Sequence, residues 1–353
     1  MLVLGHWDQW QARVQAVNKS HGPFELVLCV GNLFGSGADA GANAQVLPYV
    51  NGDKRIDIET LFVHSGPTPM PLAVVEAIDA RDGYVCDNLL FLGQSGLLTT
   101  ASGLRIAYLS GSSSSSSSDD KYSLGLHYSA KDLLTLKKVA EQKGFEGVDF
   151  LLTPGEWPRG VANVPSVSAA SGSAGASADS STGTDAIADL AKELRPRYHF
   201  VASTEEGPNS TYYERPPYKN VPIIPGRQIH VTRFFGGPPR NACVIVLTCR
   251  FFFFFPSLNP GMASCGNTSK AKWLMALNMV PLTQLDTTEL VAEPAGTTLS
   301  PYIKQGYKRS GTLPQPGDDI SASGSYFFAP DQVGTFLNLN SNFIMPFQKE
   351  SIQ

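Results

Sequence analysis

The 353-residue sequence has little charge, because Asp, Glu, Lys and Arg together make up only 16% of it. Its formal net charge of -4 argues against a protein that coats nucleic acid through bulk electrostatic attraction, although a local basic face stays compatible with it. Glycine and proline are plentiful, with 33 and 25 copies, and serine-rich stretches recur. We therefore expect an appreciable part of the length to be loop or disorder, and a folded part of roughly 200 residues.

The sequence also lacks the patterns of disulfide-rich, zinc-binding and membrane proteins. Its five cysteines are odd in number and form no Cys-x-x-Cys pair, which favours a reducing compartment and gives no thiolate metal site. The longest apolar stretch, around residues 243–255, is interrupted by Arg250 and is shorter than the roughly 18 to 20 residues that span a bilayer. No secretory signal is evident at the amino terminus. We expect a soluble protein of the cytoplasm or nucleus.

The apolar pattern predicts an α/β fold. Residues 2–5 and 25–31 read as short buried strands, and residues 10–22 between them have the apolar spacing of a helix. After residue 84 the strands follow one another through short turns, which predicts a mixed sheet or a sandwich of two sheets. Residues 129–144 form the clearest helix, with Ser129 as its cap and Gly144 as its end.

Four segments have compositions that set them apart from the folded part of the chain. Two Ser-rich inserts, residues 112–120 and 162–184, are expected to be disordered. The segment 243–261 contains five consecutive Phe followed by Pro, and its coding strand must be an unbroken run of pyrimidines because Phe codons contain only pyrimidines and Pro codons begin with two. Such a tract precedes splice acceptors, so we interpret 243–261 as retained intron; a buried apolar strand is the alternative. The folded domain is then 1–300, followed by a disordered tail, 301–353.

The run "VLCVGNLFGSG" at residues 27–37 resembles a loop that holds metal or phosphate at the end of a strand. A two-metal phosphoesterase site needs about seven Asp, His and Asn ligands, so that bound water becomes hydroxide near neutral pH. Counted generously, the chain offers the four candidates Asn32, His64, Glu156 and His199, with Gly35 where a second acid would be wanted. These are too few and too weakly anionic for two divalent ions. The alternative roles are a left-handed turn at Asn32, satisfied loop or core histidines at 64 and 199, and packing of Trp157 against the sheet end.

Residues 194–220 form the densest candidate for binding a partner. The segment interleaves the basic residues Arg195, Arg197, Arg215 and Lys219 with the tyrosines Tyr198, Tyr212, Tyr213 and Tyr218. Such a mixture suits docking of a protein partner or stacking on unpaired RNA bases, and it also occurs in loops that close sheet edges. The candidate contacts are Arg197, Tyr198, Tyr212, Tyr213, Glu214, Arg215, Pro217, Tyr218 and Arg233.

Several blocks, in order, resemble the amino-terminal region of the CwfJ family of spliceosome-associated proteins. These are "ELVLCVGNLFG", "VDFLLTPGEWPRG", "LRPRYHFVAS", "TYYERPPYKN" followed by "HVTRF", and "WLMALNMVPL" with "ELVAEP". The resemblance implies a metallophosphoesterase-like fold of two packed mixed β-sheets flanked by helices, without bound cofactor. By position it places lapsed site loops at Gly31, Asn32 and Gly35, at His64, at Glu156, Trp157 and Pro158, and at His199.

The resemblance further implies a non-catalytic nuclear module that acts in splicing and intron lariat turnover. Its partners would be spliceosomal proteins and the lariat debranching enzyme, with RNA contact as an added possibility. The chain departs from the family pattern in "GHWDQWQARV", where Gly-Asp-x-x-Gly is expected, and it lacks the carboxy-terminal histidine-triad-like half, which suggests a truncated gene product. The rival interpretation is a metal-dependent phosphodiesterase acting on RNA or nucleotides. At least four of the polar candidates converging on one cavity would favour that rival.

Overall fold

The computed structural model describes most of the first 303 residues. The described ranges are 7–34, 40–65, 69–113, 123–162, 183–202, 213–222, 229–237, 243–249 and 274–303. The chain divides into two compact units, Met1–Lys304 and Gln305–Gln353, and all described residues lie in the first. The predicted strand at residues 2–5 lies outside the described residues, and so does nearly all of the predicted tail.

Sheet A has six strands in the order β15, β14, β1, β2, β4, β3. Their bounds are β1 Leu26–Val30, β2 Thr60–Val63, β3 Tyr84–Cys86, β4 Leu89–Phe91, β14 Cys243–Cys249 and β15 Leu274–Met279. Strands β1, β2 and β4 run parallel, β14 is antiparallel to β1, and β15 is parallel to β14. β1 lies within the sheet and is covered on both faces, which explains its unbroken apolar sequence.

Sheet B has seven strands, six of them in the order β11, β13, β10, β9, β6, β5, with β12 paired to β13. Their bounds are β5 Ser95–Thr99, β6 Arg105–Leu109, β9 Val148–Leu152, β10 Pro196–Ala202, β11 Tyr213–Glu214, β12 Tyr218–Lys219 and β13 Val231–Gly237. Its central strands β6, β9, β10 and β13 are parallel, and the others pair antiparallel at its edges. A separate parallel pair joins β7, Ser112–Ser113, to β8, His127–Tyr128.

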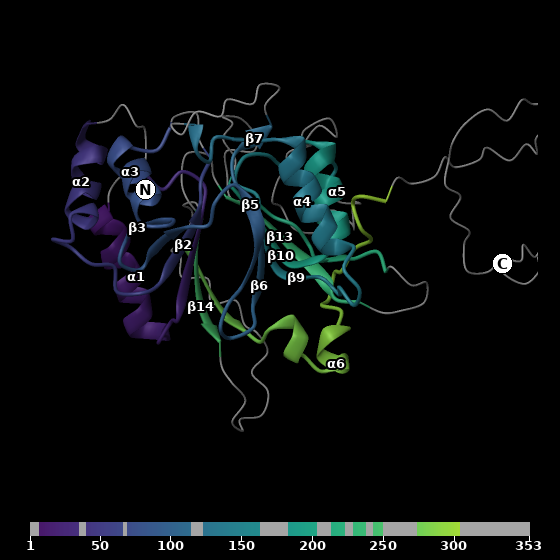
Figure 1. Cartoon of the computed structure of the whole chain (residues 1–353). Coiled ribbons are helices and arrows are strands. Elements are labelled where there is room, and N and C mark those ends of the chain that lie inside the picture. Colours follow the sequence, from purple (N-terminus) through teal and green to yellow (C-terminus); the bar gives the residue numbers. More distant parts are fainter. Residues whose placement is uncertain are drawn as a thin grey trace, which may run out of the picture. The chain divides into compact units, whose positions relative to one another are not determined.

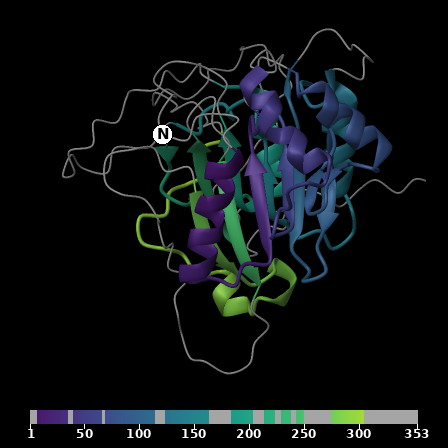
Figure 2. The ribbon, with the colours of Figure 1, turned by 90° about the vertical axis from the view of Figure 1, so that its left-hand side faces the viewer.

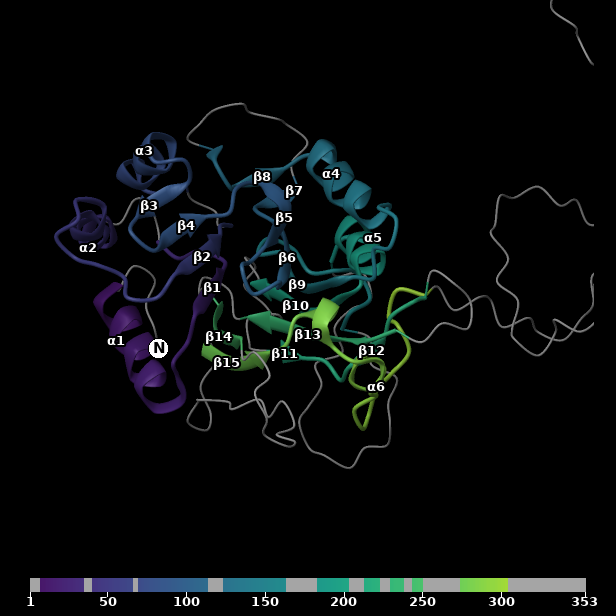
Figure 3. The same ribbon diagram turned by 60° about the horizontal axis from the view of Figure 1, so that its bottom comes forward.

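The two sheets pack face to face, and helices cover their outer faces (Figure 1). The helices are α1 Trp7–His21, α2 Ala40–Val50, α3 Leu72–Ala80, α4 Ala130–Ala140, α5 Asp185–Leu194 and α6 Thr287–Leu290, with a 3-10 helix at Leu282–Gln284. Figure 2 shows α1, α2 and α3 in front of sheet A, and Figure 3 shows α4 and α5 beside sheet B. Separate apolar clusters fill the space under α1 to α3, between the sheets, and under α4 and α5. The predicted fold class, two mixed sheets flanked by helices, is confirmed.

Local signals explain several of these boundaries. α4 begins with the capping box formed by Ser129 and Asp132, in which each side chain bonds the backbone N–H of the other residue. The helix ends at Ala140, earlier than the Gly144 end that the sequence predicts. Leu136 is buried beneath it, whereas Leu134 is exposed. None of the helices among the described residues is long and apolar enough to cross a membrane.

The compositionally unusual segments lie partly inside the described residues. Ser112 and Ser113 belong to β7, so the predicted insert 112–120 begins after an ordered strand. Thr184 precedes α5 as its N-cap residue, and most of the insert 162–184 lies outside the described residues. Residues 243–249 form strand β14, while 250–261 lie outside the described residues. The intron origin of 243–261 stays a prediction.

Candidate functional site at the carboxyl ends of the strands

The loops that carry most of the predicted site residues leave the carboxyl ends of β1, β2 and β9. In open α/β sheets this is the end at which ligands bind. Here the loops of the two sheets touch directly: the Gly111 N–H donates to the His64 carbonyl at 2.8 Å, and the Ser65 hydroxyl donates to the Pro154 carbonyl at 2.7 Å. Gly155 lies against the Gly111 carbonyl so closely that a Cβ atom there would overlap it. These contacts hold the loops after β2, β6 and β9 against one another.

Asn32 follows β1 and uses its side chain to shape the turn. Its Oδ1 accepts a hydrogen bond from the Phe34 N–H at 3.1 Å, and the residue is buried. The left-handed conformation predicted for Asn32 belongs to its neighbour Gly31, which has a φ of 116°. The prediction is wrong by one residue, because the side-chain hydrogen bond holds the Asn32 turn without a positive φ. Gly35 lies outside the described residues.

His64 is fully buried on the helix side of sheet A. Its ring centroid lies 6.4 Å from that of Phe34, a member of the apolar cluster under α1 to α3. Phe62, two residues earlier, belongs to the same cluster, as the alternation of side chains along a strand requires. His64 thus lies where the structural interpretation placed it, in the core.

His199 is fully buried on the other outer face, that of sheet B. Its Nε2 forms a hydrogen bond with the Thr153 hydroxyl at 2.7 Å, and its ring stands edge-on to Phe234 at a centroid distance of 5.2 Å. Nδ1 has no hydrogen-bond partner within the described part of the chain. Burial lowers the pKa of His199 to about 3, so the ring is neutral at physiological pH.

Glu156 holds the β7–β8 pair onto the loop after β9. Its Oε1 accepts hydrogen bonds from the backbone N–H and hydroxyl of Ser113, and its Oε2 accepts one from the Tyr128 hydroxyl at 2.6 Å. Burial raises the pKa of Tyr128, and its hydrogen bond to Glu156 raises it further. The carboxylate is fully engaged in joining two loops.

Trp157 and Pro158 are buried against the outer face of sheet B. The indole ring packs on Phe234 and Tyr213 with centroid distances of 5.4 Å to each. Gly236 of β13 lies beneath it, and a Cβ atom there would overlap the indole. Trp157 thus packs on the outer face of sheet B, over Phe234 and Gly236 of β13.

The four polar candidates therefore do not gather around one cavity. His64 and His199 lie on opposite outer faces of the sandwich, Asn32 closes its own turn, and Glu156 bonds Ser113 and Tyr128. Across the described ranges, no group of three or more His, Cys, Asp or Glu side chains is placed to hold a metal ion.

The predicted partner contacts between residues 197 and 233 are largely interior. Tyr198 stacks between the sheets with Phe200 and Phe235. The buried Arg215 donates to the Val161 carbonyl at 2.9 Å and to the Thr298 hydroxyl at 3.1 Å. For these side chains the predicted partner role is corrected, because their groups are used inside the fold.

The same correction applies to Tyr218, whose hydroxyl lies 3.4 Å from that of Tyr302 in the interior. Tyr213 and Arg233 are half-buried, packing on Trp157 and Tyr198, respectively. Glu214 is exposed and Pro217 is half-buried, so a partner role for these two stays a prediction. Tyr212 lies outside the described residues.

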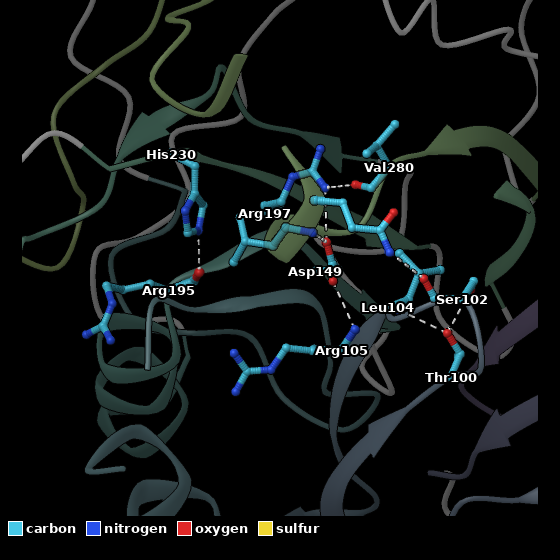
Figure 4. A network of polar contacts seen from close by, with 11 residues as sticks. Thr100, Ser102, Leu104, Arg105, Asp149, Arg195, Arg197, His230 and Val280 are labelled. Atoms are coloured by element: carbon cyan, nitrogen blue, oxygen red, sulfur yellow. Dashed lines mark hydrogen bonds and ion pairs between the residues drawn. The ribbon is translucent and has the colours of Figure 1, made fainter. Parts of the chain in front are cut away.

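A buried ionic network that the sequence analysis missed joins sheet B to the segment after β15 (Figure 4). Asp149 accepts hydrogen bonds from the Arg197 guanidinium at 3.0 Å, the Leu282 N–H at 2.8 Å and the Arg105 N–H at 2.9 Å. Arg197 also donates to the Val280 carbonyl at 2.6 Å. Burial raises the pKa of Asp149, while the Arg197 charge and these donors act against that rise. The signal available in the sequence was an acid inside the otherwise apolar run "VDFLL".

A second buried contact beside this network involves His230. Its Nε2 bonds the Arg195 carbonyl at 2.6 Å, and burial lowers its pKa to about 4. The ring is neutral near pH 7. A carbonyl can only accept, so Nε2 carries the hydrogen and donates a hydrogen bond to the Arg195 carbonyl. Both contacts serve the packing of β9, β10 and β13.

Comparison with curated proteins identifies the family. The chain is 34% identical to CWF19-like protein 1 of Homo sapiens over 310 residues, covering 87% of this chain and 48% of that protein. It is 33% identical to CWF19-like protein 1 of Xenopus laevis, covering 86% and 48% of the two chains. The chain belongs to the CwfJ/Cwf19-like family. It is also 33% identical to zinc finger CCCH domain-containing protein 64 of Arabidopsis thaliana, covering 92% of this chain and 47% of that one.

The chain of this CwfJ/Cwf19-like protein spans about half the length of the curated relatives that it matches. No family model matches it. Among solved structures, it is similar to TT1561 of Thermus thermophilus, with 10% identity, a TM-score of 0.41 and coverage of 67% of this chain and 86% of that one. This similarity is too low to bear on function, which depends on the site itself.

Proposed function

We propose that this chain is a non-catalytic binding module with a metallophosphoesterase-like fold, acting in pre-mRNA splicing and in turnover of excised intron lariats. Its proposed partners are spliceosomal proteins and the lariat debranching enzyme, which it would bind or activate in the nucleus. Membership of the CwfJ/Cwf19-like family supports this proposal. The partners belong to the proposal, because the chain spans only about half of its relatives.

The observation that carries the non-catalytic part is the use of the site residues in packing. Asn32 and Glu156 use side-chain oxygens in hydrogen bonds within the fold, and His199 does so through Nε2. His64 and His199 lie on opposite outer faces of the sandwich. A two-metal site needs several anionic ligands around a shared open position. The direct contacts between the loops after β2, β6 and β9 support this part of the proposal.

The rival is a metal-dependent phosphodiesterase acting on RNA or nucleotides. One observation favours it: Asn32 and His64 follow neighbouring parallel strands, so both begin at the end of the sheet where ligands bind. Calorimetric titration of Mn²⁺ into the purified chain, followed by hydrolysis of bis(p-nitrophenyl) phosphate, separates the two. We expect neither saturable binding nor turnover. Binding of two ions, with turnover abolished by Asn32→Ala, would establish the rival.

Binding to the purified debranching enzyme tests the partner part of the proposal. The side chain of Glu214 is exposed on β11. We expect Glu214→Lys to weaken binding about tenfold, which corresponds to about 1.4 kcal/mol. Glu141→Lys, an exposed site after α4, provides the matched control for the change in charge. Absence of binding by the unaltered chain would refute this part while leaving the Mn²⁺ result unaffected.

A further inference from the structure

A cavity of about 720 Å³ lies at the opposite end of sheet A from the loops described above. Its wall includes Ile56 and Asn88, which precede β2 and β4, and the Asn88 side chain donates to the Ile56 carbonyl at 2.9 Å. The remaining wall comes from the end of α2 and the loop after it, from Arg81 directly after α3, and from strand β3 with Asp87. The volume falls in the range of roughly 300 to 1,000 Å³ found for small-molecule sites.

A guanidinium in the wall is held in a fixed position. Arg81, directly after α3, donates from Nη1 to the Val85 carbonyl at 2.9 Å and from Nη2 to the Val50 carbonyl at 3.1 Å. A guanidinium has five N–H donors, so about three stay available. Arg81 forms no ion pair with a carboxylate among the described residues. It therefore offers a preorganised positive charge with spare donors.

The charges around the cavity leave an excess of positive charge. Lys54, Arg55 and Arg81 line it, against one lining acid, Asp87. Lys54 is neutralised by Asp8, which it approaches at 2.7 Å. Arg55 makes no ion pair within the part of the chain that the structure describes. Two arginines thus face a single carboxylate, and arginine suits phosphate because its planar fork matches phosphate oxygens.

The cavity also has an aromatic wall, and Asp87 is the one acid among the described residues that line it. Tyr84 of β3 is 40% exposed and lines the cavity, so its ring is accessible for stacking. Cys86, on the same strand, is buried, and burial raises the pKa of its thiol to about 11. That thiol is neutral near pH 7 and does not oppose an anion.

We propose that this cavity binds a nucleotide, with phosphate at Arg55 and Arg81 and the base against Tyr84. Arg81 supplies a guanidinium held by two hydrogen bonds, Arg55 supplies a second one without an ion pair among the described residues, and Tyr84 supplies an accessible ring. These groups match both parts of such a ligand. The site is separate from the carboxyl ends of the strands, and it adds a small-molecule ligand to the proposed binding module.

Calorimetric titration of the full chain with ADP, adenosine and inorganic phosphate tests this proposal. We expect ADP to bind with a dissociation constant below about 1 mM, and more tightly than either fragment. Arg55→Gln should weaken ADP binding at least tenfold, whereas Arg13→Gln, on the exposed face of α1, should have no effect. Tyr84→Leu should weaken ADP binding without changing the affinity for phosphate.

Arg81→Lys adds a test of the fork geometry, because it keeps the charge and removes the paired donors. We expect it to weaken ADP binding as well, and its thermal unfolding profile checks that loss of the contacts to Val50 and Val85 has not unfolded the chain. The proposal is overturned if ADP does not bind, or if Arg55→Gln binds it normally. Equal affinities for ADP and phosphate, both insensitive to Tyr84→Leu, would also overturn it.

Discussion

Two of the buried histidines, His199 and His230, make the stability of this protein sensitive to mild acid. His199 and His230 are enclosed in sheet B, where burial lowers their pKa values to about 3 and about 4 from an ordinary value of 6.5. Each ring is neutral in the folded chain and titrates normally after unfolding. Unfolding therefore takes up protons when the pH lies between the folded and the unfolded pKa of each histidine, and acid favours the unfolded chain.

The sign and size follow from these pKa values. A lowered folded pKa means that the stabilisation is fully present above about pH 6.5 and is lost as the pH falls toward the folded pKa. A pH of 5 lies about 1.5 units below the pKa of 6.5 of a histidine in the unfolded chain, so that histidine is protonated, whereas the buried one is still neutral. One pH unit below the unfolded pKa corresponds to about 1.36 kcal/mol. Each histidine therefore lowers the free energy of unfolding at pH 5 by about 2 kcal/mol, and the pair lowers it by about 4 kcal/mol.

The aspartates with shifted pKa values change this picture little above pH 5. Asp8, Asp132 and Asp286 have lowered pKa values, so their contributions are lost only below an ordinary value of 3.8. Burial raises the pKa of Asp149, so protonation of this carboxylate in the folded state offsets part of the acid loss at the low end. The window from pH 7.5 to pH 5 therefore reports mainly on the histidines.

Urea denaturation at pH 7.5 and pH 5.0 measures the effect directly. His230→Gln keeps a side-chain donor toward the Arg195 carbonyl but removes the titration, so we expect the loss between the two pH values to shrink by about 2 kcal/mol. His127→Gln changes an exposed histidine and serves as the control. An unchanged pH dependence in His230→Gln would refute the assignment of acid sensitivity to this buried ring.

Three further predictions concern packing. Asp149→Ala should lower the free energy of unfolding by about 3 to 5 kcal/mol, because Arg197 then loses its buried partner; chemical denaturation measures this. Gly236→Ala should destabilise the chain by pushing its new methyl group into the Trp157 indole, and Trp157→Phe should recover part of the loss in a double-mutant cycle. Deletion of 243–261 should leave a folded chain with a cooperative thermal transition, and loss of that transition would show that β14 is indispensable to sheet A.

Elements with strong local signals could be predicted from the sequence. β1 and β9 are short apolar runs that the fold covers on both faces, and α4 starts at a cap encoded within four residues, Ser129 to Asp132. Apolar spacing predicts the helix at 10–22, although α1 begins at Trp7. Its missed beginning includes Trp7, whose burial depends on contact with Tyr49 of α2, a residue distant in sequence.

The candidate site was less predictable because long-range pairing decides which polar residues are buried. The block "TYYERPPYKN" has the composition of a binding surface, yet Arg215 bonds Thr298 and Tyr218 approaches Tyr302, about 80 positions away along the chain. No local pattern distinguishes a tyrosine that meets a partner from one that meets its own carboxyl-terminal segment. A count of possible metal ligands depends less on chain pairing, because an acid that is absent from the sequence is absent in any fold.

The register of sheet A explains why the chain should fold without β14. β14 pairs Val244 with Cys29 on one side and with Leu274 on the other, and Cys29 and Leu274 both face the cluster under α1 to α3. The next residue of β14, Ile245, pairs with Leu28 of β1 and with Met275 of β15. Leu28 and Met275 both face the space between the sheets. Because β15 is parallel to β14, it is antiparallel to β1.

β15 can therefore replace β14 beside β1 with every side chain kept on its present face. A one-residue slip would instead move the whole apolar set to the wrong face. With 243–261 removed, residues 238–242 and 262–273 connect β13 to β15. Amide hydrogen exchange then distinguishes the two outcomes: β1 amides that now pair with β14 should stay protected if β15 takes its place, and should exchange rapidly if that edge of the sheet is left open.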